Sequence, residues 1–195
     1  SRAVSGDKIW VAAGTYKPTT GTDRTISFVM KNGVEILGGF PDSGNPGLGD
    51  RNWAANETIL SGEIGAAGMA DNSFNVVENN GTNNTAILDG FQILFGNANF
   101  DTGTNPTGRG GGIYNGDNSS PTIRNCAFRS NFGAYGGAVY NRNGCFPSFT
   151  NCTFIGNQSA AWGAACFTEG ASTVTFINCS FSGNTGIPGV IYSNG

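Results

Sequence analysis

The chain has 195 residues and a formal net charge of −3, and charged side chains make up 12% of it, against about 25% in ordinary globular proteins. It has no basic patch and no apolar run approaching about 18 residues, so we expect neither a nucleic-acid partner nor a membrane span. The chain has no histidine, which excludes a Ser-His-Asp triad, histidine metal ligands and histidine acid–base chemistry.

The N-terminal half contains short apolar segments separated by loops rich in glycine, asparagine and proline. Their length and composition favour strands rather than helices. The predicted strands are residues 8–12, 25–30, 34–40, 58–62, 74–78, 86–90 and 91–95. Because the intervening loops at 41–57, 62–73, 79–85 and 96–109 are long, we expect this half to form wide, irregular turns.

The C-terminal half contains an internal repeat. The heptapeptides NCAFRSN, NCTFIGN and NCSFSGN begin at Asn125, Asn151 and Asn178, at spacings of 26 and then 27 residues. A second motif, GGGIYN, GGAVYN, WGAACF and PGVIYS, recurs at a constant spacing of 26. A third element, PTIR, PSFT or TVTFI, precedes each heptapeptide. This alignment predicts two columns of equivalent residues, one of Ile113, Val139, Ala165 and Ile191 and the next of Tyr114, Tyr140, Cys166 and Tyr192.

Each repeat thus holds three short apolar pieces with glycine or asparagine between them, and helical periodicity is lacking. Short strands repeating near 26 residues are typical of one turn of a parallel β-solenoid, in which equivalent residues stack about 4.8 Å apart. The predicted fold is all-β, a single-stranded parallel β-helix with about 26 residues per turn in the C-terminal half. We expect one β-helix domain over residues 1–195, with irregular turns over 1–109 and regular repeats over 110–195.

Several segments resemble known bacterial repeat proteins. SGDKIWVAAGTYKP, VEILGGF, NETILSGEI and AILDGFQI resemble the opening of right-handed parallel β-helix proteins of the pectate-lyase-like superfamily. FRSN, FIGN and FSGN match the FxxN pattern, and GGGI and GGAV match the GG[A/L/I/V] pattern, of polymorphic outer-membrane-protein repeats. The resemblance implies a right-handed coil and a bacterial extracellular or outer-membrane surface location. This fold carries lyases, hydrolases and adhesins alike, so it implies no single activity.

Three sets of repeated residues are expected to form structural ladders. An asparagine between two strands can adopt the left-handed bend and hydrogen-bond its neighbours, with Asp89 as the equivalent residue one turn earlier. Stacked cysteines do not converge on a tetrahedral zinc ion, so we expect them to fill core space, with their thiol or disulfide state open. The three ladders are Asn125, Asn151 and Asn178; Cys126, Cys152 and Cys179; and Phe128, Phe154 and Phe181.

The tyrosine column is expected to face outward if the apolar column beside it faces inward. An exposed aromatic row is either a platform on which carbohydrate stacks or a set of side chains that stack across strands. Tyr135 lies near this row. The candidate ligand-binding residues are Tyr114, Tyr140, Tyr192, Trp162 and Arg109.

Few charged residues are available for catalysis. From residue 125 onward they are Arg129, Arg142 and Glu169, too few for the paired carboxylates of a hydrolase or the base and calcium site of a lyase. We therefore expect no catalytic residue, and the remaining candidates are Asp89, Asp101, Asp117 and Arg124. No cofactor is expected, although the oxygen-rich segment 97–106 is a candidate calcium site, with a simple turn loop as the alternative.

The leading functional hypothesis is a non-enzymatic β-helix segment of a secreted or cell-surface bacterial protein. Its role would be adhesion, recognition or a stalk, with glycans or host and cell-surface molecules as partners. The alternatives are a polysaccharide lyase or glycoside hydrolase with its site near 89–124, and a structural filament or surface-layer subunit. The sequence ends where a further repeat would begin, so we also expect a longer protein or self-association at that end.

Overall fold

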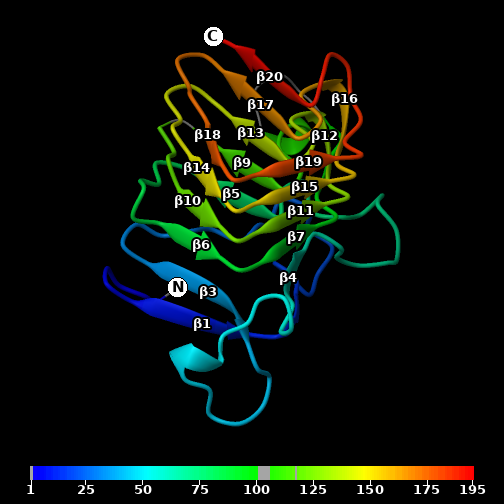
Figure 1. The fold of residues 1–195 in the computed structure, drawn as a ribbon. Helices are drawn as coiled ribbons and strands as arrows, with labels where there is room; N and C mark the ends of the chain where they lie inside the picture. The colour runs from blue at the N-terminus through cyan, green and yellow to red at the C-terminus, as the bar shows by residue number, and fades with distance from the viewer. Residues whose placement is uncertain (1, 101–105, 117) are drawn as a thin grey trace.

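The computed structural model describes residues 2–100, 106–116 and 118–195 and is a parallel β-helix. Its strands stack coil upon coil from the N-terminal to the C-terminal end, so that the termini lie at opposite ends of the stack (Figure 1). Among the described residues the helical segments are two 3-10 turns, Leu48–Asp50 and Pro106–Gly108. Neither has the length or the apolar character that a membrane-crossing helix needs.

The strands of the described residues form four sheets, and every strand pair is parallel. Sheet A contains β1 (Lys8–Ala12), β3 (Glu35–Phe40), β6 (Ile87–Asp89), β10 (Thr122–Arg124), β14 (Ser148–Thr150) and β18 (Thr175–Ile177). Sheet B contains β2 (Gly14–Tyr16), β4 (Thr58–Ser61), β7 (Gln92–Leu94), β11 (Ala127–Arg129), β15 (Thr153–Ile155) and β19 (Ser180–Ser182). Sheet C contains β5 (Val77–Asn79), β9 (Ile113–Asn115), β13 (Val139–Asn141), β17 (Cys166–Glu169) and β20 (Ile191–Asn194). Sheet D contains β8 (Asn97–Ala98), β12 (Phe132–Tyr135) and β16 (Gln158–Trp162).

The predicted fold class is confirmed, but the regular coils contain four strands where the sequence predicted three apolar pieces. The additional strands are those of sheet D. They escaped prediction because β12 and β16 lack the alternation of apolar and polar residues: β12 reads FGAY and β16 reads QSAAW.

The predicted strand at 25–30 is absent. Within it only Phe28 bridges to Val77, and Ile26 and Val29 are exposed. Two residues further on, the backbone N–H of Met30 donates to the side-chain Oδ1 of Asn79 at 3.3 Å, in place of a backbone carbonyl. A side-chain acceptor thus interrupts the backbone ladder that a strand requires.

The constant spacing of 26 in the second motif is wrong for its later copies. Val139 pairs with Cys166, not with the predicted Ala165, and Tyr140 pairs with Phe167. Cys166 in turn pairs with Ile191. The cause is an extra residue in β16, which shifts the register between β12 and β16. Phe167 therefore takes the place in the tyrosine column that the sequence assigned to Cys166.

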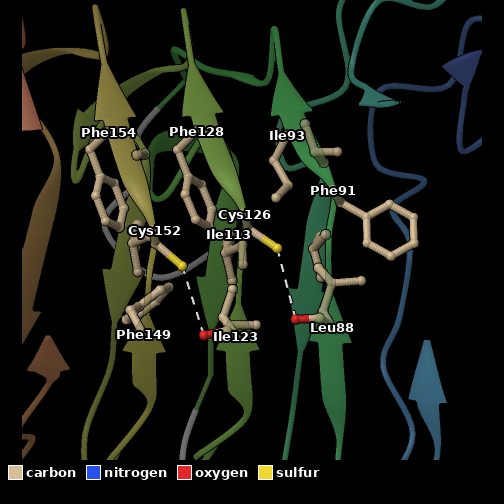
Figure 2. Packing of buried hydrophobic residues seen from close by; sticks show 14 of the residues in the cluster. Leu88, Phe91, Ile93, Ile113, Ile123, Cys126, Phe128, Phe149, Cys152 and Phe154 are labelled. Atoms are coloured by element: carbon tan, nitrogen blue, oxygen red, sulfur yellow. Dashed lines mark hydrogen bonds between the residues drawn. The ribbon is translucent and has the colours of Figure 1, made fainter. Parts of the chain in front are cut away.

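The interior of the coil is packed with stacked apolar side chains from sheets A, B and C. Phe128 and Phe154 are parallel with ring centroids 4.7 Å apart, and Phe154 and Phe181 continue the stack at 4.8 Å. Figure 2 shows Phe128 and Phe154 side by side on neighbouring strands, with Ile93 in the same row on the coil before. The predicted phenylalanine column thus lies in the core.

Candidate functional site

The asparagines that open the heptapeptides form a hydrogen-bonded row at the corner between sheets A and B. Asn125, Asn151 and Asn178 have positive φ angles of 51°, 54° and 50°. Nδ2 of Asn178 donates to Oδ1 of Asn151 at 2.7 Å, and Nδ2 of Asn151 donates to Oδ1 of Asn125 at 3.1 Å. Nδ2 of Asn125 donates to Oδ1 of Asp89 at 2.8 Å, so this outer ladder ends on a carboxylate. The expectation that Asp89 is equivalent to Asn125 is wrong by one residue, because Asp89 pairs with Arg124 and Gly90 holds the equivalent bend.

Asp89 is buried and is held by two arginines. Nη2 of Arg51 lies 2.6 Å from its Oδ1, and Nε of Arg124 lies 3.1 Å from its Oδ2. Arg124 also lies 3.8 Å from Glu35, whose other oxygen is 3.1 Å from Lys8. Two of the catalytic candidates, Asp89 and Arg124, thus meet, but as members of an ion-pair row across sheet A. Asp101 and Asp117, the other two, lie outside the described residues.

Arg51 fastens the loop between β3 and β4 to the coil. Its Nε donates to the carbonyl of Gly38 at 2.7 Å, and its Nη2 donates to the backbone carbonyl of Asp89 at 2.8 Å. The same guanidinium lies over the ring of Trp53, 5.0 Å from the ring centroid. Trp53 nevertheless remains 45% exposed, so the loop presents an indole ring to solvent beside sheet B.

A groove of about 310 Å³ lies between this loop and the outer face of sheet B. Its polar side chains include Glu57 and Arg129, both exposed, and the partly exposed Gln92. Asn125 and Asn151 of the outer ladder line the groove. Each side-chain amide has one N–H and one oxygen lone pair that its hydrogen bonds within the ladder do not use. The residues that line the groove are Trp53, Ala54, Glu57, Gly90, Phe91, Gln92, Asn125, Cys126, Ala127, Arg129, Asn151 and Thr153.

The chemistry that this groove offers is hydrogen bonding and stacking. Amides donate and accept, the Arg129 guanidinium donates, and the Glu57 carboxylate accepts. Because Asp89 accepts hydrogen bonds from Arg51 and Asn125 and forms an ion pair with Arg124, its carboxylate is committed to structure. Among the described lining residues, Glu57 is the one carboxylate, whereas glycoside hydrolysis uses a pair.

The tyrosine column does face away from the coil interior, but the expectation that it is exposed is wrong. Tyr114 and Tyr140 are 3% and 1% exposed and stack with centroids 5.7 Å apart. Tyr135 of sheet D packs over this row, and Arg109 lies 5.1 Å from the ring centroid of Tyr140. The side chains of sheet D, which the sequence did not predict, cover the tyrosines.

A small hollow of about 140 Å³ remains beside this aromatic row. It is bordered by Arg109, which pairs with Glu169 at 3.5 Å, and by Trp162, which is 38% exposed. Burial, reinforced by the hydrogen bond to Glu169, raises the pKa of Tyr140 above its ordinary value. The structure thus brings the five candidate ligand-binding residues together in one cluster, in which Trp162 and the half-buried Tyr192 are the more accessible members.

In the described part of the candidate calcium segment, the side chains of Asn97 and Asn99 already hydrogen-bond other protein groups. Nδ2 of Asn97 donates to the carbonyl of Met69 at 2.5 Å, and Oδ1 of Asn99 accepts from Arg24 at 2.9 Å. Residues 101–105 lie outside the described residues. Elsewhere in the described chain, no group of three histidine, cysteine or acidic side chains converges as a metal site would require.

The cysteine column consists of free thiols pointing into the core. Sγ of Cys126 lies 3.1 Å from the carbonyl of Arg124, and Sγ of Cys152 lies 3.4 Å from that of Thr150. Each thiol also donates to a carbonyl on the preceding coil, that of Leu88 or Ile123 (Figure 2). Burial raises the pKa of Cys126 from 9.0 to about 12 and raises that of Cys152 as well. The described geometry suits inert, space-filling thiols.

Two further ladders run inside the coil. The second asparagine of each heptapeptide forms one, in which Nδ2 of Asn131 donates to Asn157 at 3.0 Å and Nδ2 of Asn157 donates to Asn184 at 2.9 Å. The asparagine ending GGxxYN forms the other, which runs from Asn79 through Asn115 and Asn141 to Thr168. The signal was present in the sequence, because the second asparagine recurs in all three heptapeptides and the other ends both copies of GGxxYN.

The groove residues Trp53, Gln92 and Glu57 were not predicted from the sequence. One available signal was the tryptophan in the long 41–57 insertion, because large aromatics in polar loops mark binding surfaces more often than core. Its distance from the heptapeptides gave no indication that it lies beside them. Only the stacking of the coils reveals that proximity.

Comparison with protein families matches residues 9–195 to the family described as right handed beta helix region. Comparison with curated proteins and with solved structures gave no significant match. The family match covers nearly the whole chain and agrees with the stacked parallel strands of the four sheets. The chain therefore belongs to the right handed beta helix family.

Proposed function

We propose that this chain is a non-catalytic glycan-recognition module of a secreted or cell-surface bacterial protein. The observation that carries the proposal is the exposed Trp53 ring, fixed beside a row of side-chain amides in the groove of sheet B. The tyrosine row, which the sequence offered as one candidate for this role, is too deeply buried at Tyr114 and Tyr140 to offer a stacking face.

The lining of the groove suits a carbohydrate. Aromatic rings contribute apolar area with little conformational freedom to lose, and the apolar face of a sugar ring packs against such a surface. Sugar hydroxyls both donate and accept hydrogen bonds, as do the amides of Gln92, Asn125 and Asn151. The groove follows successive coils, which supports an extended chain as ligand rather than a compact molecule.

Binding without cleavage is favoured by the state of the charged groups. The buried acid of this region, Asp89, is neutralised by two arginines, and Glu57 has no second carboxylate beside it among the described lining residues. A lyase or hydrolase would need a free acid and base on opposite sides of the scissile bond. The alternative of a polysaccharide-degrading enzyme therefore becomes an outcome of the test below.

The surface location rests on the repeats. FxxN and GG[A/L/I/V] motifs recur at equivalent positions of the coil, in the manner of polymorphic outer-membrane-protein repeats. The partners proposed from this setting are glycans on host cells, on neighbouring bacteria or in an extracellular matrix.

A glycan array that includes acidic and neutral polysaccharides tests the proposal with the chain as it stands. We expect binding that Trp53→Ala reduces at least about tenfold, because the stacking face is lost. Trp162→Ala is the matched control, since Trp162 is a similarly exposed tryptophan outside the groove.

The same samples are monitored for unsaturated and reducing-end products. Product formation by the wild-type chain would overturn the non-catalytic proposal. Loss of binding in Trp162→Ala but not in Trp53→Ala would move the site to the tyrosine cluster and refute the groove.

A further inference from the structure

The groove depends on a buried group that does not itself line it. Asp89 is absent from the groove lining, yet it contacts both parts that form the site. Its Oδ1 accepts from Nη2 of Arg51 at 2.6 Å and from Nδ2 of Asn125 at 2.8 Å. Arg51 in turn lies over the ring of Trp53, and Asn125 in turn accepts a hydrogen bond from Asn151. One carboxylate oxygen of Asp89 thus links the loop that carries Trp53 to the asparagines that line the groove.

The direction of the outer ladder indicates what Asp89 does. In both inner ladders the Nδ2 group donates toward the following coil, as from Asn131 to Asn157. In the outer ladder the Nδ2 group donates toward the preceding coil, where Asp89 lies. An ionised carboxylate can only accept, so Asn125 must turn its Nδ2 toward it and its Oδ1 toward Asn151. The orientation of each later amide follows from that first bond.

We propose that Asp89 is the positioning residue of the groove, holding Trp53 through Arg51 and fixing the direction of the amide row through Asn125. This inference rests on the proposed glycan-recognition function and adds how the site is preorganised. Asp89 and Arg51 then determine affinity without touching the glycan, because an immobilised ring and oriented amides lose less freedom on binding.

The chain contains a matched control for Arg51. Arg24 fastens another long segment in the same way, donating from Nε to the carbonyl of Asn72 at 2.6 Å and from Nη2 to that of Asn97 at 2.9 Å. It also lies over an aromatic ring, 4.1 Å from the centroid of Phe74. Arg24 lines no part of the groove, so Arg24→Gln and Arg51→Gln remove comparable contacts at different places.

The first measurement does not require a glycan. In a background with Trp10→Phe and Trp162→Phe, Trp53 is the one remaining tryptophan, and acrylamide quenching of its fluorescence reports its mobility and exposure. Arg51→Gln and Asp89→Asn are each expected to raise the quenching constant toward that of free tryptophan, and Arg24→Gln to leave it unchanged. Unchanged quenching in Arg51→Gln would overturn the proposal, whether or not any glycan binds.

The second measurement is the affinity for the polysaccharide found on the array. Arg51→Gln is expected to weaken binding about tenfold, with Arg24→Gln near wild type. Arg51→Lys is expected to recover part of the loss, because lysine keeps the charge but not the planar, forked contact. If Arg51→Gln does not fold, Arg51→Lys and Asp89→Asn carry the test. Full affinity in both would refute the positioning role, whereas absence of wild-type binding would refute the recognition function alone.

Discussion

Buried asparagine side chains are tolerated in this core because each one hydrogen-bonds its equivalents on neighbouring coils. Asn131 and Asn157 are at most 1% exposed, and each also donates to a backbone carbonyl, of Ile93 and Phe128 respectively. A buried amide costs free energy unless it is satisfied, and a stack of amides satisfies all its members at once. A single hydrophobic replacement in the row would remove one side-chain hydrogen bond from each neighbouring amide.

Because the thiols are buried, we expect the free energy of unfolding to depend on pH in the alkaline range. Burial raises the pKa of Cys126 and of Cys166 from 9.0 to about 12. Below about pH 9 both thiols are protonated in the folded and unfolded states, so they add no pH dependence. Between about pH 9 and 12 only the unfolded state releases these protons, so the free energy of unfolding falls by about 1.4 kcal/mol per pH unit for each thiol.

Urea melts from pH 8 upward check this prediction. Cys126→Ala with Cys166→Ala is the control, and its free energy of unfolding should fall less steeply above about pH 9. Equal slopes for the two proteins would show that the thiols are not the groups responsible.

At the scale of the strand and its bends, glycine is required where the chain turns into each strand of sheet C. Gly110, Gly136 and Gly163 occupy equivalent positions before the strands of sheet C, with φ angles of 64°, 64° and 67°. At Gly136 a Cβ atom would lie 2.2 Å from the carbonyl oxygen of Val139. Gly156 has a similar φ of 63° but open space around it, and its equivalent one coil earlier is Ser130.

These two glycines give a paired prediction. Gly156→Ala should cost about 1 kcal/mol, the ordinary penalty for a side chain in the left-handed region. Gly136→Ala should cost about 3 kcal/mol or more, because the backbone clash adds to that penalty. Chemical denaturation of both variants measures the difference, and equal losses would mean that the bend yields without strain.

The sequence was sufficient to predict the elements that repeat with an apolar pattern. Apart from β2, which was not predicted, the strands of sheets A and B lie close to the predicted segments. In the regular repeats this is because inward phenylalanine and isoleucine alternate with outward residues. Sheet D and the absence of a strand at 25–30 could not be predicted, because they depend on contacts with the neighbouring coil. These are the backbone partners of β12 in sheet D and, at Met30, the side-chain acceptor of Asn79. The one-residue shift at Cys166 has the same origin, since a bulge leaves no mark in the repeat motif.

At the scale of the whole molecule, each coil contacts mainly the coils before and after it, so stability depends on nearest-neighbour stacking. Phe154 stacks on Phe128 on one side and on Phe181 on the other. Phe154→Ala should therefore cost about 3–5 kcal/mol, and Phe181→Ala less, because Phe181 is only partly buried. Equilibrium unfolding of the two variants compares them, and a larger loss for Phe181→Ala would contradict nearest-neighbour stacking.

The groove could not be predicted at this scale because it joins residues that are distant in sequence. Trp53 and Glu57 come from an insertion in the irregular half, whereas Asn125, Arg129 and Asn151 come from the regular repeats. Each residue alone is compatible with an ordinary loop or strand. Their proximity follows from the stacking of β4, β7, β11 and β15 in sheet B.

The bulge in β16 also bears on how a chain of this kind can vary. From β6 to β7, β10 to β11, β14 to β15 and β18 to β19, the same number of residues carries the chain around the corner of the outer ladder. From sheet B to sheet C, through sheet D, that number differs from one coil to the next. In these four coils insertions and deletions are thus absorbed between sheets B and C, while the corner that carries the outer ladder keeps its spacing. One coil earlier, from β3 to β4, the same corner admits the insertion at 41–57 that carries Trp53. The molecule therefore admits a long binding loop at this corner just before the amide row begins, and holds the spacing of the corner constant from Asp89 onward.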